Sequence, residues 1–289
     1  GYLTYLSASV LIGLNVLSWP ILYLLLQSYV QEWPGVMCIY GVTQIGAGSA
    51  GGSRFLPTLV AALQWVKPLV VFCGGAAFMV YIANRRTQTA PLTRSVLGLM
   101  VLTGLISVSD SLVEGTYLAI PKTELRLSGG CCTTTLDVMQ QAGKFQPNTR
   151  IDDSYRRLLP PGYFGLNTAI VAGLAAFLRK PRRFSLRAVS ATATVGSLIS
   201  VPVNLLFLAE VAAPAILGLQ FHRCPYDLVN AAPESLLTVV LYAAGVFCCG
   251  WSLILDYVGH NGQTRAFLPE YLERLLFVAC FCFAGVFIV

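Results

Sequence analysis

Seven long apolar stretches restrict the fold of this chain more than any other feature. They cover residues 6–30, 60–83, 95–119, 162–178, 189–219, 234–256 and 269–289. A helix needs about 20 apolar residues to cross the hydrocarbon core of a bilayer. Backbone groups cannot stay unbonded in lipid, and the alternating segments of a membrane barrel are not seen in the sequence. The sequence therefore predicts an all-α integral membrane protein with about seven transmembrane helices.

The composition agrees with this prediction. Hydrophobic residues make up 56% of the 289 residues, and charged residues only 11%, whereas a soluble domain has roughly 25% charged residues. The mean hydropathy is +0.69. These values exclude a disordered chain, a coiled coil and a soluble disulfide-rich mini-protein. The net charge of +6 arises largely from short loops, so we expect a lipid bilayer and no nucleic acid as partner.

Basic residues in the short loops predict the orientation of the chain. The loops after the second, fourth and sixth stretches carry ten of them: Arg85, Arg86, Arg94, Arg179, Lys180, Arg182, Arg183, Arg187, Arg265 and Arg274. The loops after the first and fifth stretches carry only Arg54 and Arg223. Since cytoplasmic loops are enriched in Lys and Arg, we expect a bacterial-type inner-membrane protein with a cytoplasmic N-terminus and a periplasmic C-terminus. Residues 1–289 then form one polytopic domain, with 120–161 as an extracytoplasmic cap. Further residues are expected at both ends, because the chain starts at Gly1 and stops within an apolar run.

Four of the nine cysteines fall in loops predicted to lie outside. They are Cys38, Cys131, Cys132 and Cys224. Adjacent cysteines rarely bond each other, because the bridge strains the peptide between them. We therefore expect Cys131 and Cys132 to pair with different partners, Cys38 and Cys224, so that structural disulfides join the three periplasmic loops.

Two other interpretations of these cysteines stay open. The first is a redox-active thiol pair that exchanges electrons with a partner. The second is a metal site in which Cys224, His222 and Met37 bind Cu(I) or a similar soft ion. Both would make the outward-facing loops a working site.

Four ionisable residues lie within the apolar stretches. They are Lys67, Asp110, Glu114 and Glu210. At 1.5 Å per residue, all four reach the outer half of the membrane, and Asp110 and Glu114 share one helix face. One interpretation is a polar cavity that serves as a proton relay, an ion path or a pocket for a quinone head group. The other is a purely structural pair between Lys67 and a carboxylate such as Glu210 that joins two helices.

No complete catalytic set can be read from the sequence, so whether the chain is an enzyme stays open. We expect a non-catalytic subunit or scaffold of a larger respiratory, electron-transfer or transport complex, with other membrane-protein subunits as partners. This function requires no cofactor. The alternatives are a membrane thiol–disulfide or quinone-linked redox protein, and a periplasm-facing metal-handling or transport protein. Quinone or copper would be the cofactor in those cases.

Overall fold

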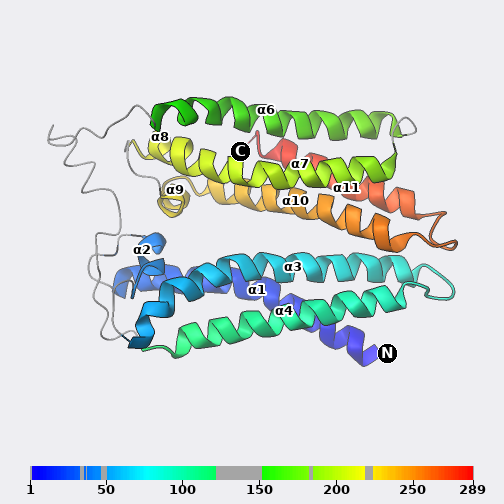
Figure 1. Cartoon of the computed structure of the whole chain (residues 1–289), viewed down its shortest axis with the longest axis horizontal. Coiled ribbons are helices and arrows are strands. Elements are labelled where there is room, and N and C mark those ends of the chain that lie inside the picture. Colours follow the sequence, from blue (N-terminus) through cyan, green and yellow to red (C-terminus); the bar gives the residue numbers. More distant parts are fainter. Residues whose placement is uncertain are drawn as a thin grey trace. The chain divides into compact units, whose positions relative to one another are not determined.

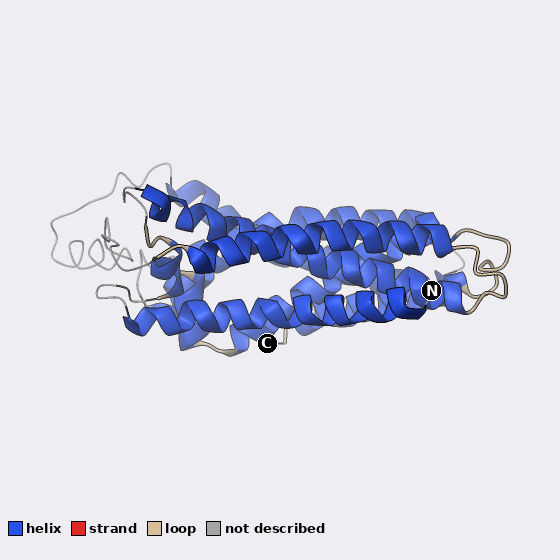
Figure 2. Ribbon diagram, turned by 90° about the horizontal axis from the view of Figure 1, so that it is seen from below, coloured by secondary structure: helices blue, strands red, loops and turns tan. Residues whose placement is uncertain are grey.

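The computed structural model describes residues 2–32, 36, 38–46, 51–121, 152–181, 185–218 and 224–288. Every regular element in these ranges is helical (Figures 1 and 2). Six segments are long and apolar enough to cross a membrane: Tyr5–Glu32, Gly52–Arg85, Thr93–Ala119, Tyr155–Arg179, Leu186–Leu217 and Glu234–Gly259. The predicted all-α membrane fold is confirmed, whereas the count of seven spans is not.

The seventh predicted span is the helix α11 (Leu268–Gly285). Its 18 residues include Glu270, Glu273 and Arg274, which all lie in the first two turns. These charges leave a shorter apolar part than the other six segments have. The helix therefore forms where it was predicted, but its composition alone does not make it a span.

The contacts between Cα atoms divide the chain into two compact units. The first unit contains residues 1–81 and 93–132, and the second contains 82–92 and 133–289. The single polytopic domain stays a prediction. The helical elements of the first unit are α1 (Tyr2–Glu32), α2 (Ile39–Thr43), the 3-10 helix η1 (Gly51–Phe55), most of α3 (Leu56–Arg85) and α4 (Thr93–Ala119).

The helix α4 buries polar side chains and exposes apolar ones. Its buried residues recur at helical spacing and are Val96, Thr103, Ser107, Asp110 and Tyr117. On its outer face Val101, Leu105 and Leu112 are more than 60% exposed. This arrangement is the reverse of a soluble amphipathic helix, and it places the apolar face where lipid would cover it.

The helices α1 and α3 pack against each other in the first unit. A Cβ added at Gly74 of α3 would lie 3.0 Å from Cγ1 of Ile12, so glycine favours this close approach. Tyr5 and Tyr81 bring their rings to a centroid distance of 4.7 Å. These contacts fix the position along α1 at which its polar residues meet α3.

The second unit is a helical bundle. Its elements are α6 (Asp152–Arg179), α7 (Leu186–Phe207), the π-helical segment η3 (Leu208–Ala212), α8 (Ala213–Leu217), α9 (Pro225–Ala231), α10 (Glu234–Gly259) and α11. Their Cα atoms approach within 8 Å between α6 and α7, α7 and α10, α10 and α11, and α6 and α11. Small residues permit this packing, since a Cβ at Gly245 would lie 3.0 Å from the ring of Phe283.

The helix α6 begins ten residues before the predicted span 162–178 and so takes up the end of the predicted cap. Its first turns carry Asp152, Asp153, Arg156 and Arg157, which lower the local hydropathy below that of a span. The rest of the cap, residues 122–151, lies outside the described residues.

The fifth apolar stretch is interrupted near its end. The Ala213 N–H donates to the carbonyl of Leu208, five residues back, which makes this turn π-helical. Pro214 has no N–H, and its ring would clash with the carbonyl of Glu210 in a regular helix. The helix accommodates Pro214 by a widened turn at Leu208–Ala212.

Candidate functional site

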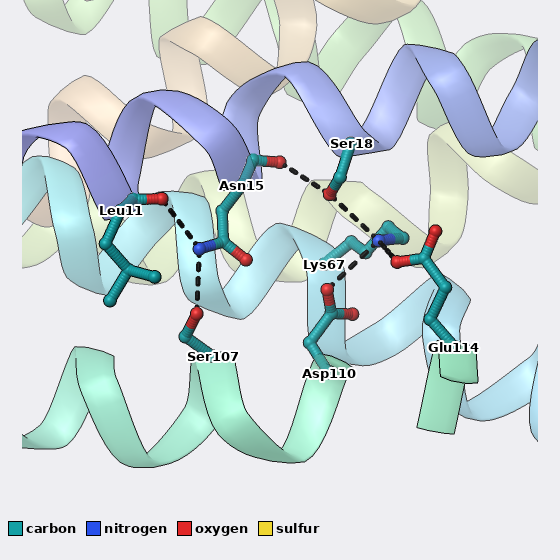
Figure 3. A network of polar contacts seen from close by, with 7 residues as sticks. All are labelled: Leu11, Asn15, Ser18, Lys67, Ser107, Asp110 and Glu114. Carbon is teal, nitrogen blue, oxygen red and sulfur yellow. Dashed lines mark hydrogen bonds and ion pairs between the residues drawn. The ribbon is translucent and has the colours of Figure 1, made fainter. Parts of the chain in front are cut away.

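Lys67 is the most deeply buried charged residue at the centre of the first unit. It projects from α3, and only 2% of the residue is exposed. Its Nζ atom donates to Ser18 Oγ at 3.0 Å, to Asp110 Oδ2 at 3.0 Å and to Glu114 Oε2 at 2.8 Å (Figure 3). A lysine ammonium has three protons. All of its donors are therefore used, and its charge faces two carboxylates.

We call Lys67, Asp110 and Glu114 the buried charge cluster. The two carboxylates are four residues apart on α4, which places them on one helix face toward Lys67. The side chain of Asp110 is 3% exposed, whereas that of Glu114 is 21% exposed. Glu114 is thus the member of the cluster that remains accessible from outside the protein.

The helix α1 supplies the neutral part of the network. Asn15 Nδ2 donates to Ser107 Oγ at 2.7 Å and to the carbonyl of Leu11 at 2.8 Å. Ser18 Oγ, which accepts from Lys67, itself donates to the carbonyl of Asn15 at 2.9 Å. The buried charge cluster and these neutral side chains together connect three helices, α1, α3 and α4, by hydrogen bonds (Figure 3).

A proline lies close to the site on each of two helices. Pro20 follows Ser18 on α1, and Pro68 follows Lys67 on α3. Because proline lacks an N–H, the carbonyl four residues before it loses its usual helical partner. The regular helical bonding is therefore interrupted about one turn before each proline.

The charges of the cluster do not balance. With both carboxylates ionised, one lysine faces two negative charges, which leaves a net charge of −1. Asp110 Oδ1 is buried and meets no hydrogen-bond partner among the described residues. A buried uncompensated charge is expensive and is usually removed by protonation. The cluster therefore holds one carboxylate more than it has cations.

Glu210 does not take part in this cluster. It belongs to the second unit, where Oε2 accepts from Arg156 Nη2 at 3.0 Å and from Arg156 Nε at 3.2 Å. The suggested pairing of Lys67 with Glu210 is wrong, because the donors of Lys67 are taken by Ser18, Asp110 and Glu114. Arg156 escaped the sequence analysis because it lies in the part of α6 that was expected to be loop.

The predicted outer cysteines are only partly described. Cys38 is the N-cap residue of α2 and is 1% exposed, and Cys224 is the N-cap residue of α9 and is 7% exposed. Cys131, Cys132, Met37 and His222 lie outside the described residues. None of the seven described cysteines is in a disulfide bond. The disulfide, redox and metal interpretations therefore stay predictions.

Comparisons of the chain with protein-family models, with curated proteins and with solved structures gave no match.

Proposed function

We propose that this chain is a non-catalytic, proton-binding subunit of a larger respiratory, electron-transfer or transport complex. The observation that carries the proposal is the imbalance of the buried charge cluster, in which Lys67 faces both Asp110 and Glu114. Ionisable residues inside a membrane are costly, and they commonly mark proton or ion pathways. One proton bound between the two carboxylates would make the cluster neutral.

The difference in exposure between the two carboxylates supports exchange of that proton. Asp110 is enclosed, while the side chain of Glu114 is 21% exposed. A proton can thus enter through Glu114 and be shared with Asp110, which lies one turn away on the same face. Because the binding of a proton by itself drives no other process, we place the site in a complex where proton uptake is coupled to a second reaction.

Infrared difference spectroscopy of the protein in bilayers tests the proton. At neutral pH the wild type should show the carbonyl stretch of a protonated carboxylic acid. Asp110→Asn and Glu114→Gln should each remove this band, because the remaining carboxylate then forms a neutral pair with Lys67. The control is Glu270→Gln, which changes an exposed carboxylate on α11 and should leave the band in place. A wild type without the band, or a band that persists in both cluster variants, contradicts the proposal.

The proposal of a complex is tested separately. The chain has a mass of 31.2 kDa, and on its helix α1 Leu3, Leu14 and Leu24 are at least 60% exposed. Native electrophoresis after extraction from its own membranes in mild detergent should show a species larger than the monomer. A monomer under every mild condition would contradict the subunit assignment.

The predicted disulfides between the outer loops belong to the same proposal. Cys38 and Cys224 are both buried at the ends of short helices outside the long spans, as expected for residues that anchor loops. An impermeant thiol reagent applied to whole cells should label Cys38, Cys131, Cys132 and Cys224 only after strong reduction. Labelling without reduction would favour the redox alternative, and labelling only after chelation would favour the metal alternative.

A further inference from the structure

A basic cleft lies in the second unit where α7 and α11 begin and α10 ends. Its volume is about 610 Å³. The charged residues that line it are Arg187, Asp256, His260 and Arg265. Both arginines and the histidine are exposed, whereas Asp256 is 3% exposed. The cleft therefore presents mainly positive charge to its opening.

Asp256 lies at the base of the cleft and holds His260. The Nδ1 atom of His260 is 2.6 Å from the carbonyl oxygen of Asp256 and 3.6 Å from its Oδ1 atom. The other carboxylate oxygen, Oδ2, has no hydrogen-bond partner among the described residues. Among the described residues that line the cleft, two arginines and one histidine face a single aspartate. A ligand that carries negative charge would suit this lining.

The N-terminus of α7 opens onto the same cleft, since Ser185, Leu186 and Arg187 all line it. Ser185, the N-cap residue of this helix, makes no capping side-chain bond within the described ranges. The first N–H groups of a helix have no partner inside it. Helix N-termini together with arginines are a recurring arrangement for phosphate binding.

The apolar lining and the position of the cleft indicate a lipid as the source of the phosphate. Leu186, Leu268 and Leu272 line the cleft beside the arginines. An inorganic phosphate ion would gain nothing from this apolar lining, whereas the glycerol and acyl parts of a lipid would pack against it. The cleft also lies where one candidate span begins, at Leu186, and another ends, at Gly259. This is the level at which head groups meet a transmembrane helix.

We infer that this cleft binds the phosphate head group of an anionic phospholipid, with Arg187 and Arg265 as its principal contacts. A phosphodiester carries one negative charge, and the two arginines of the lining offer it charge-assisted hydrogen bonds. The site is independent of the buried charge cluster, so the two proposals can fail separately.

Lipid binding to the purified full chain in detergent tests the inference. Native mass spectrometry with added phosphatidylglycerol, phosphatidylcholine or inorganic phosphate compares the three probes. The wild type should bind phosphatidylglycerol most tightly. The variant Arg187→Gln/Arg265→Gln should weaken that binding roughly tenfold or more, because charge-assisted hydrogen bonds are lost.

The matched control is Arg179→Gln/Lys180→Gln. It removes the same charge from two exposed residues at the end of α6 that do not line the cleft. Equal losses in the two double variants would mean diffuse attraction and would overturn the site. If inorganic phosphate competes for Arg187 and Arg265 as effectively as the lipid, the lipid assignment is overturned. All four substituted residues are exposed, and circular dichroism checks that each variant stays folded.

Discussion

The helices α4 and α7 bury polar residues in two different ways. On α4 of the first unit the buried face includes Asp110, which requires a partner from another helix and finds Lys67. On α7 of the second unit the buried polar residues are all neutral: Ser190, Thr194, Ser197, Ser200 and Asn204. Both helices expose aliphatic side chains on the opposite face. They therefore share one pattern of burial but differ in charge.

Most of the buried neutral side chains on α7 form a hydrogen bond within their own helix. The hydroxyls of Thr194, Ser197 and Ser200 donate to carbonyls three or four residues back on the same helix. Such bonds need no neighbouring helix, and the small side chains allow close approach. A buried charge cannot be compensated by such a bond within its own helix. Three residues of α7 also bond neighbouring helices: Thr194 to the Cys249 carbonyl, Ser200 to Tyr242 and Asn204 to Asn167. For Thr194 and Ser200 these bonds add to those within α7, whereas the charge on α4 depends on its partner from another helix.

The substitution Lys67→Met should have the largest effect on stability. It leaves Asp110 and Glu114 buried without a cation, and breaking a buried ion pair from one side costs about 3–5 kcal/mol. Unfolding by SDS in mixed micelles measures this loss. Lys180→Met changes an exposed lysine and should be nearly neutral. Adding Asp110→Asn and Glu114→Gln to Lys67→Met should recover much of the loss. If the triple variant is as unstable as Lys67→Met alone, the stability of α4 does not depend on the balance of these charges.

Gly245→Ala should have the next largest effect, and it tests whether the second unit depends on packing. The new Cβ would lie 3.0 to 3.1 Å from three ring atoms of Phe283, and overpacking of this kind costs about 1–3 kcal/mol. Gly173→Ala on α6 is the control, since no described atom beyond its own helix comes within 4 Å of its Cβ position. It should be neutral or slightly stabilising in the same unfolding assay. Equal effects at both positions would contradict the packing argument.

Asn204→Leu should cost less than Lys67→Met, although it also breaks a buried polar contact. Asn167 Nδ2 donates to Asn204 Oδ1 at 2.8 Å but also to the carbonyl of Tyr163 at 2.9 Å. Hydrogen bonds between membrane helices contribute on average about 0.6 kcal/mol, so a loss of this order is expected. In the double variant with Asn167→Leu the loss should largely disappear. A loss as large as that of Lys67→Met would remove the distinction between charged and neutral polar faces.

Glu270→Gln should have the smallest effect. Glu270 pairs with Arg274 one turn away on α11, and both side chains are more than half exposed. Exposed pairs at this spacing contribute about 0.3–0.5 kcal/mol. The same unfolding assay should place this variant within that margin of the wild type. A larger loss would show that the charges of α11 lie in a less polar surrounding than their exposure indicates.

The sequence singled out Lys67, Asp110, Glu114 and Glu210 as ionisable residues in apolar stretches, but it did not show which of them meet. Charged residues in apolar stretches are rare enough to be noticed, and the spacing of Asp110 and Glu114 places them on one face. Periodicity says nothing about which helix lies opposite, so Lys67 could have met Glu210 as well as Asp110. Ser18 and Asn15 could not be recognised, because Ser and Asn in a span often bond only their own helix.

The long helices were predictable because hydropathy follows the part of a helix that lipid would cover. The start of α6 was missed for the same reason, since its first turns are charged and carry Arg156, the partner of Glu210. The π-helical turn at Leu208–Ala212 could not be read from the sequence. Proline marks where the regular helical hydrogen bonds are interrupted, but whether the helix bends or forms a widened turn depends on the surrounding packing.

The charged start of α11 bears on how this chain enters a bilayer. Charged residues oppose insertion by the translocon, so a segment with Glu270, Glu273 and Arg274 in its first turns is a weak insertion signal by itself. The segment is joined to α10 by a short connection and fits closely against it at Gly245 and Phe283. We therefore expect the two helices to enter lipid together as a hairpin, in which the strongly apolar α10 supports its weaker neighbour. A lesion in α10 should then also impair the insertion of α11.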